Sequence, residues 1–592
     1  MISRKTLQAA AAVVAVGTLT LTACSSGGGG GTKSGDKASA SPSKFNEHPN
    51  IVVGTAADSQ GPAKPVEGAK AGGTVKNIER DDYEHLDPAQ VYSNTGSNFS
   101  LLITRGLTGY KQEGNTVKLV GDLATDTGVA SDGGKTWTFK LKDGVKWETG
   151  DAITSADVKH SIERSFAPFI TQGATYVQRW LTEEDYRKAY TGPYDGKHLD
   201  NVTTPDEKTI VFKFAKPHAD FNYAMAMTTY GVVSQKGDTK EEYDKKPVSS
   251  GPYKIVNRVT DKSLSLERNT NWDAKTDPIR HAYPDKWNFE FGYQAIPATD
   301  KLLAADKGED VNTMSFYSGV AGDRLQKVLD DASVKDRLVK GESPYADYYY
   351  INNKKVTDLK VRQALNYAWP HQQIRTTEGG PATGTYSTTL LNPSVAGFQD
   401  YDLFGKKEKP TGDPEKSKAL LKEAGKENYK IVYAYNNTPN QQKVSVVIED
   451  ALKKAGFEVV LKPIDTKTWY DEISKVDKQF DVFWGGWGAD WPNASTVLPV
   501  LFDGRLIQDG SNNYANFNDP EVNAEIDRIL DLADLNEQNK AWGALDKKIM
   551  EKAALIPGIQ EKFYILHGSK IGGATYDALG KIISPNDVFV KQ

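Results

Sequence analysis

A strand–helix–strand pattern in residues 431–461 constrains the fold more than any other feature of this sequence. Residues 431–435 and 457–461 are two short apolar runs, each with the length and composition of a buried strand. Between them, apolar residues recur at helical spacing from Val444 to Ala455, and Gly456 is placed to cap the helix. A strand, a helix and a strand in this order predict a right-handed parallel crossover, and therefore an α/β lobe.

The stretch FDVFWGGWGADWPNAS, residues 480–495, follows this crossover and is unlike the rest of the chain. Residues 480–484 are predicted to form another buried strand, with the glycine-rich residues 485–488 at its carboxyl end. Ligands of open α/β sheets bind outside the carboxyl ends of the strands. We therefore expect glycines that let a backbone approach closely, tryptophans that wall a pocket, and a carboxylate, Asp490, that meets a cation.

Length, charge and motif content limit both the architecture and the chemistry. With 592 residues the chain is too long for one compact core, so we expect at least two lobes. Basic and acidic residues are interleaved and the net charge is −5, which argues against a nucleic-acid surface. The sequence has no nucleophile elbow, zincin, Walker or C-x-x-C motif, and its eight histidines lack metal-ligand spacing. We expect no catalytic residue, metal or cofactor, although a glycosidase pair of carboxylates stays open.

The N-terminus predicts export and a lipid anchor. Arg4 and Lys5 precede an apolar run, residues 7–21, that is short for a spanning helix, so residues 1–23 are predicted to be a signal peptide. Leu-Thr-Ala-Cys, ending at Cys24, resembles the bacterial lipobox, whose cysteine is acylated; a chance thiol beside a cleavage site is the alternative. Residues 24–71 contain five consecutive glycines and few apolar residues, which predicts a flexible tether, with ordered structure from about residue 72.

Residues 131–166 give the clearest local predictions. Alternating apolar and polar residues at 137–141 predict a strand with one buried face. Asp143-Gly144 predicts a hairpin turn, with a returning strand through residues 145–147. Thr154 is placed to cap a helix that follows, as Asp358 is placed to cap a later one.

Eight segments, in order along the chain, carry a resemblance to a known family. They are residues 86–88, 106–108, 131–166, 250–253, 266–272, 361–365, 480–490 and 516–522. From about residue 72 to the C-terminus, the chain resembles the peptide-type solute-binding proteins of ABC importers, which include the oligopeptide- and dipeptide-binding proteins. The resemblance implies an α/β, two-lobed periplasmic-binding-protein-like fold of class II, the large peptide-binder subtype. It places lobe I at 72–315, lobe II at 316–545 and a return to lobe I at 546–592, with a hinge that closes on the ligand.

The same resemblance implies the main ligand residues. In peptide binders of this family, an aspartate in a Gly-Trp-x-x-Asp segment holds the α-ammonium group of the ligand, and Gly486, Trp487, Gly488 and Asp490 match that segment. A buried ammonium must be paired, and a carboxylate gives it a charge-assisted hydrogen bond. The alternatives are that Asp490 caps the next turn and that Trp487 is simply part of the core.

Further candidates come from both lobes. Lys355 matches a lysine that can meet the ligand carboxylate in an oligopeptide binder, although a solvated surface lysine is equally consistent. Tyr92, Ser93 and Asn94 fall where the family's first lobe contacts the peptide backbone, and Tyr176 falls where an aromatic residue lines the cleft. For these four residues, a turn or a core position is the alternative.

The function implied is that of a receptor anchored by lipid at Cys24 on the outer face of the membrane, as in Gram-positive members of the family. It would capture oligopeptides and deliver them to the membrane permease, and we expect it to be a monomer. An oligosaccharide stays open as the ligand, because some members bind cello-oligosaccharides on aromatic platforms and this chain has eleven tryptophans. Nickel or a siderophore is a further option, and a surface enzyme or adhesion protein is the most distant.

Overall fold

The computed structural model describes residues 49–183, 185–580 and 582–592. The predicted signal peptide and Cys24 lie outside the described residues. Within them, no helix combines the length and the apolar character that crossing a membrane requires.

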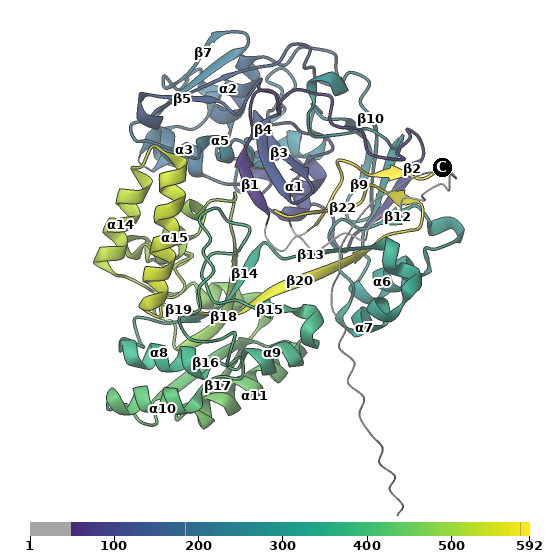
Figure 1. Cartoon of the computed structure of the whole chain (residues 1–592). Helices are drawn as coiled ribbons and strands as arrows, with labels where there is room; N and C mark the ends of the chain where they lie inside the picture. The colour runs from purple at the N-terminus through teal and green to yellow at the C-terminus, as the bar shows by residue number, and fades with distance from the viewer. Residues whose placement is uncertain (1–48, 184, 581) are drawn as a thin grey trace, which may run out of the picture. The chain divides into compact units, whose positions relative to one another are not determined.

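Lobe II, residues 345–557, is built on a five-stranded sheet with the order β17-β16-β18-β14-β19 (Figure 1). The strands are β14 Tyr345–Ile351, β16 Lys430–Asn436, β17 Glu458–Ile464, β18 Val482–Gly488 and β19 Leu555–Pro557. Strand β16 is parallel to β17 and β18, and helix α11, Pro439–Lys454, connects β16 to β17. The predicted parallel crossover is confirmed. Strand β14 runs antiparallel to its neighbours β18 and β19.

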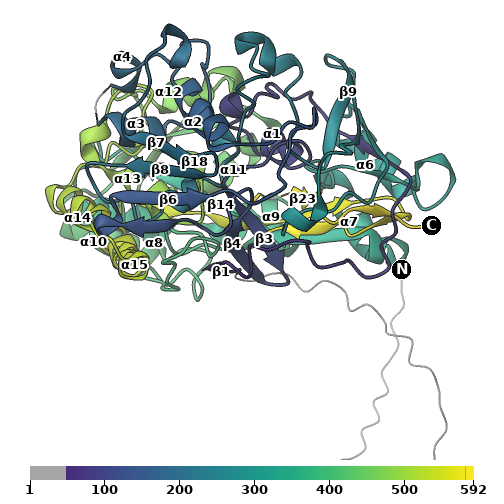
Figure 2. The same cartoon turned by 90° about the horizontal axis from the view of Figure 1, so that it is seen from above.

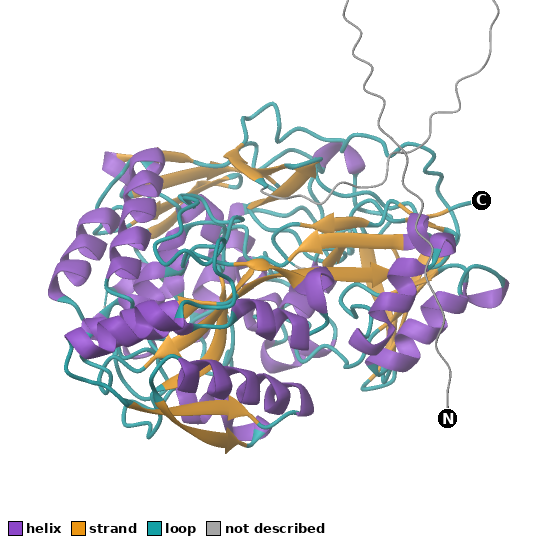
Figure 3. Cartoon of the chain, turned by 60° about the horizontal axis from the view of Figure 1, so that its bottom comes forward, coloured by secondary structure: helices purple, strands orange, loops and turns teal. Residues whose placement is uncertain are grey.

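Helices cover both faces of this sheet (Figure 3). One face carries α8 Leu359–Ala368, α9 His371–Thr377, α10 Pro414–Glu423 and α11. The other carries α13 Leu498–Phe502, α14 Pro520–Leu530 and α15 Leu535–Glu551. The Asp358 carboxylate accepts from the amides of Lys360 and Val361, so the predicted cap of α8 is confirmed.

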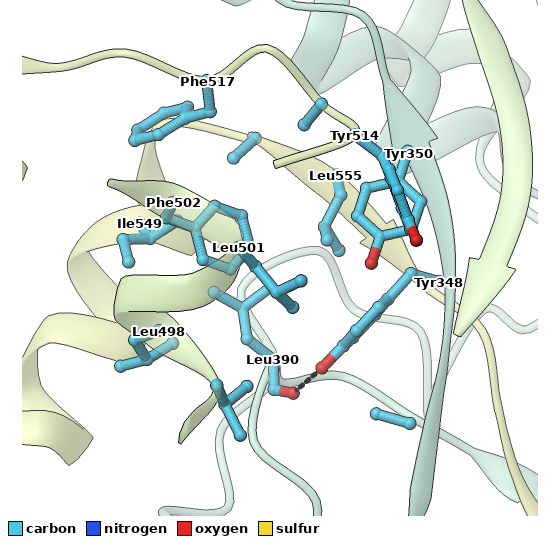
Figure 4. Packing of buried hydrophobic residues seen from close by; sticks show 14 of the residues in the cluster. Tyr348, Tyr350, Leu390, Leu498, Leu501, Phe502, Tyr514, Phe517, Ile549 and Leu555 are labelled. Carbon is cyan, nitrogen blue, oxygen red and sulfur yellow. Dashed lines mark hydrogen bonds between the residues drawn. The ribbon is translucent and has the colours of Figure 1, made fainter. Parts of the chain in front are cut away.

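Strand β14 shows how the alternation of side chains divides the lobe II core into two parts. Tyr349 and Ile351 are buried on the α8–α11 side, whereas Tyr348 and Tyr350 are buried on the α13–α15 side. Figure 4 shows these two tyrosines facing the apolar side chains of α13, with the Tyr348 hydroxyl donating to the carbonyl of Leu390. The sheet is thus buried on both faces, and its packing fixes the positions of the residues that follow its strands.

Lobe I contains two larger sheets. One has the order β12-β2-β11-β10-β9, with β2 Thr74–Ile78, β9 Tyr253–Val259, β10 Ser263–Arg268, β11 Lys286–Glu290 and β12 Thr313–Met314. The other has the order β5-β6-β8-β7, with β5 Val129–Ser131, β6 Thr136–Lys140, β7 Val202–Asp206 and β8 Thr209–Lys213. Helix α2, Ser155–Arg164, packs on β7 and β8 (Figure 2).

Further helices and short strands lie elsewhere in the described chain. The helices are α1 Asn94–Ser100, α3 Tyr176–Thr182, α4 Tyr186–Ala189, α5 Phe221–Ala224, α6 Ala295–Ala304, α7 Gly322–Asp330 and α12 Trp469–Ile473. The strands are β15 Gly384–Tyr386, β21 Ile571–Gly572, β22 Thr575–Asp577, β23 Ile582–Ser584 and β24 Phe589–Val590.

The strand and the helix predicted within residues 131–166 are confirmed, but the hairpin is wrong. The Thr154 and Asp157 side chains form the capping box of α2. Strand β6, however, pairs with β5 and β8, and residues 145–147 form no returning strand beside it. The Trp147 side chain is buried, its amide donates to the Asp151 carbonyl, and Lys146 forms an antiparallel bridge with Ala152, so residues 145–147 pair with the residues that follow them.

Ordered structure begins earlier than predicted. Strand β1, Asn50–Val53, pairs in parallel with β4, Thr116–Gly121, which also pairs with β3, Thr108–Glu113. Beyond it, the buried Ser59 hydroxyl accepts from the Gly121 amide at 2.9 Å. The tether prediction is therefore wrong for residues 50–71. Composition favoured disorder there, but three β-branched residues in β1 and contacts with distant parts of the chain outweigh it.

Two crossing segments join the lobes. Strand β13, Leu338–Glu342, leads through residues 343–344 into β14, and β19 leads through Gly558 into β20, Ile559–Leu566. Strands β13 and β20 pair antiparallel, as Figure 1 shows near its centre. Phe316 packs with Trp287 in the lobe I core, and Leu555 packs in the lobe II core. Both crossings thus lie later in the chain than the predicted boundaries at 316 and 546.

Candidate ligand-binding cavity

A cavity of about 750 Å³ is lined by residues of both lobes. Its size falls in the range of 300–1,000 Å³ that is usual for small-ligand pockets. Seven of the nine residues predicted to contact ligand line it: Tyr92, Ser93, Asn94, Gly486, Trp487, Gly488 and Asp490. The two others are Tyr176, which contacts Asp490, and Lys355.

Asp490 follows β18 and lies between two tyrosines of lobe I. Its Oδ1 accepts from the Tyr92 hydroxyl at 2.9 Å, and its Oδ2 accepts from the hydroxyl of Tyr176, the first residue of α3. Burial raises the pKa of Asp490 above its usual value, and the hydrogen bonds from Tyr176 and Tyr92 act in the opposite direction. No lysine, arginine or histidine of the described chain forms an ion pair with this carboxylate. It is a half-buried acid whose side chain accepts hydrogen bonds from neutral donors alone.

The lobe I side of this contact is built around the start of α1. Ser93 is the N-cap of α1, and its hydroxyl accepts from the Gly96 amide at 3.3 Å. Ser93 therefore has a capping role that was not predicted from the sequence, and it also lines the cavity, as Asn94 does. Tyr92 precedes the cap, and its ring is 50% exposed while its hydroxyl reaches Asp490.

The glycines of the 480–495 stretch lie within β18 rather than beyond its end. Gly488 pairs with Tyr345 of β14, and a Cβ on Gly488 would collide with that ring. A Cβ on Gly485 would lie 2.8 Å from the Tyr350 ring. At Gly486 the nearest atom is a carbonyl oxygen at 3.3 Å, so that position has more space. The prediction that these glycines admit a close backbone is corrected: two of them make room for cross-strand tyrosines.

The tryptophans of the stretch separate into two groups. Trp484 and Trp487 line the cavity, and the Trp487 indole donates to the Thr496 carbonyl at 2.8 Å. Trp491 instead inserts into the lobe I core, where it is 2% exposed and its ring lies 4.7 Å from that of Tyr176. Its indole donates to Oδ2 of the buried Asp220 at 2.9 Å. Asp490 and Trp491 thus cross between the lobes side by side.

Lys355 is not brought to the cavity. Its ammonium lies 3.1 Å from Oδ1 of Asp481, the residue that precedes β18. Asp490 follows the opposite end of that seven-residue strand, and seven residues of strand span about 23 Å. Lys355 therefore does not line this cavity and pairs with a carboxylate of the protein, and its ligand role stays a prediction.

Other cavity residues were not predicted from the sequence. Three further carboxylates line the cavity, namely Asp347 of β14, Glu561 of β20 and Asp577 of β22, together with Tyr110, Tyr317, Tyr345 and Tyr470. These residues are scattered over more than 400 positions and belong to no shared motif, so only the fold brings them together. No set of three or more histidines, cysteines or acids in the described residues is placed to hold a metal ion.

Comparisons with known proteins agree with this architecture. The sequence profile described as "Bacterial extracellular solute-binding proteins, family 5 Middle" matches residues 118–508. The periplasmic murein peptide-binding protein MppA of Escherichia coli is 26% identical over 82% of this chain and 86% of its own. The periplasmic oligopeptide-binding protein OppA of Haemophilus influenzae is 25% identical over 72% of this chain and 77% of its own. The solved "Clavulanic acid biosynthesis oligopeptide binding protein 2" superimposes with a TM-score of 0.82 and 27% identity, covering 93% of this chain and all of the other.

Proposed function

The chain belongs to family 5 of the bacterial extracellular solute-binding proteins, and from this premise we propose that it captures oligopeptides and delivers them to the permease of an ABC importer. The observation that carries the proposal is Asp490, a half-buried carboxylate that lines the cavity with no cation of the described chain against it. Burying an unpaired charge is costly. The α-ammonium group of a peptide supplies the missing charge and three hydrogen-bond donors.

The geometry supports capture between the lobes. Asp490 comes from lobe II, and the tyrosines that hold it come from lobe I, so a ligand bound to Asp490 touches both. A ligand that contacts both lobes stabilises the closed arrangement over the open one, which is the basis of hinge closure. Two relatives with comparable sequences are named for peptides, which favours this ligand class.

An oligosaccharide is the second candidate, favoured by the aromatic lining. Tyr92, Tyr317 and Tyr470 are each more than 40% exposed while lining the cavity, which Trp484 and Trp487 also line. Such rings form stacking platforms, and carboxylates accept hydrogen bonds from sugar hydroxyls. A neutral sugar does not require a charged carboxylate at Asp490, which argues against an oligosaccharide as the ligand.

We further infer from the sequence that the receptor is a monomer attached through acylated Cys24 to the outer face of the cell membrane. Substituting Cys24→Ala should release the protein into the medium and abolish its labelling by radioactive palmitate. Retention of the variant at the membrane would contradict the anchor while leaving the ligand proposal unaffected.

A thermal-shift panel tests the ligand class. The chain from residue 25 onward is mixed with tri- to hexapeptides, with the same peptides acetylated at the N-terminus, and with cello-oligosaccharides. A ligand at about one hundred times its dissociation constant adds roughly 2.7 kcal/mol to the free energy of unfolding. We expect free peptides to raise the melting temperature and acetylated peptides to fail. A shift with sugars alone would overturn the peptide proposal.

A further inference from the structure

The described wall of the cavity is acidic from both sides. Asp347, Asp490, Glu561 and Asp577 line it, and no described lining residue is basic; Lys581 lies outside the described residues. Carboxylates in a space of low dielectric repel one another strongly and are stabilised by cations that enter with a ligand. One ammonium at Asp490 leaves Asp577, which lobe I contributes to the lining, without a matching charge from the described chain.

Asp577 resembles Asp490 in its surroundings, although it belongs to the other lobe. It ends strand β22, and its Oδ1 accepts from the amides of Leu579 at 2.8 Å and Gly580 at 3.2 Å. These bonds occupy one carboxylate oxygen, and no ion pair joins Asp577 to a basic residue of the described chain. Burial raises the pKa of Asp577, and the two backbone amides act in the opposite direction.

A second group in the same wall also lacks a partner. Tyr110, from β3, lines the cavity, and its buried hydroxyl has no hydrogen-bond partner in the described chain. The Tyr110 ring lies close enough to Asp577 for that charge to contribute to raising the pKa of Tyr110. Buried hydroxyls are ordinarily satisfied by protein or by what binds there. A carboxylate and a free hydroxyl together form an acceptor-rich wall suited to a cationic group.

One tyrosine connects the two acids. The pKa of Tyr345 is raised first by burial and then by nearby tyrosine and carboxyl groups, among them both Asp577 and Asp490. Both carboxylates therefore lie within electrostatic reach of the same ring, which itself lines the cavity. Asp490 and Asp577 line the same cavity of about 750 Å³, and a peptide of a few residues has the reach to contact more than one part of a cavity of this size.

We propose that Asp577 is a second cation subsite, so that the preferred ligand carries two positive charges: an α-ammonium group at Asp490 and a lysine or arginine side chain at Asp577. The identity of the first charge as an α-ammonium rests on the proposed function. The role of Asp577 does not, because it follows from the wall of the cavity alone. The chain is then a receptor that favours basic peptides over neutral ones.

Matched peptides test the subsite. Tripeptides of alanine carry either lysine or norleucine, which has the same carbon chain without the charge, at each position in turn. Titration calorimetry of the chain from residue 25 should give at least tenfold tighter binding for lysine at one position. In Asp577→Asn, the lysine and norleucine peptides should bind within twofold of each other, and the norleucine peptide should bind within twofold of its wild-type affinity. The control Asp323→Asn, which changes an exposed acid of lobe I, should alter neither affinity. Equal or tighter binding of norleucine at every position would overturn the proposal, as would a lysine preference that survives in Asp577→Asn.

Diamine probes separate this subsite from the peptide proposal. 1,5-Diaminopentane should protect the wild-type protein against thermal unfolding more than pentylamine does, and Asp577→Asn should abolish the difference. If the diamine behaves so while no peptide binds, the peptide function fails and the subsite stands. If peptides bind without preference for lysine, and the diamine has no advantage over pentylamine, the subsite fails and the peptide function stands.

Discussion

The substitution Asp490→Asn separates the charge of this residue from its shape. The amide keeps the size of the side chain and one acceptor oxygen for the tyrosines, but it cannot neutralise an ammonium. Hydrogen bonds to charged groups contribute about 1.5–3 kcal/mol, and breaking a fully buried pair costs about 3–5 kcal/mol. Because Asp490 is half-buried and lines the cavity, we expect a loss of about 2–3 kcal/mol, or roughly 30- to 150-fold in Kd.

Titration calorimetry with a free tripeptide and its N-acetylated form gives a cycle that isolates this interaction. The free peptide should lose affinity in Asp490→Asn, whereas the acetylated peptide, already weak, should change little. The unliganded variant should melt at or above the wild-type temperature, because burial raises the pKa of Asp490 and its charged form is costly at pH 7. An acetylation penalty that is equal in the two proteins, or a Kd for the free peptide that changes less than threefold, would refute the reasoning.

Three further predictions address stability and closure. Burial raises the pKa of Glu378 from 4.5 to about 7. The folded state therefore binds this proton more tightly than the unfolded state, and the stability that results is lost as pH rises through 7. Glu378→Gln should melt near the wild-type temperature at pH 4 but be up to about 3 kcal/mol more stable than the wild type at pH 8. Equal differences at both pH values in scanning calorimetry would contradict this. Gly488→Ala should lower the free energy of unfolding in urea by about 1–3 kcal/mol, because the added methyl group meets a tyrosine ring. Gly486→Ala should lower it less, and the opposite order of the two losses would contradict the contacts of these glycines. Trp491→Phe removes the hydrogen bond to Asp220, so peptide binding should weaken about tenfold and small-angle scattering should show a larger radius of gyration; an unchanged radius and Kd would exclude Trp491 from closure.

The parts of the fold that could be predicted from the sequence depend on local periodicity. The crossover through α11 and the capping box at Thr154 each follow from neighbouring residues, and the structure has both. The return after Asp143-Gly144 was wrong because β6 finds its partners in β5 and β8, the second of which lies about 70 residues away. Strand β1 was missed because its pairing with β4 outweighs a composition that favours disorder.

The candidate site divides in the same way. Asp490 was identifiable because its motif is contiguous, and the fold places it at the cavity. Lys355 also matched a local pattern, but Asp481, more than 120 positions away, competes for its charge. Asp577 carries no local signal at all, since its position at the cavity depends on the return of the chain through β20 to lobe I. A single sequence does not show which distant residue pairs with a given side chain, or which distant residues the fold brings to one site.

The most direct test of the account is a crystal structure of the protein with a bound tripeptide. We predict that the α-ammonium nitrogen lies about 3 Å from a carboxylate oxygen of Asp490, with the peptide enclosed between the lobes. A peptide whose ammonium group lies elsewhere, with Asp490 still contacted only by Tyr92 and Tyr176, would contradict the central claim that this carboxylate recognises the ligand.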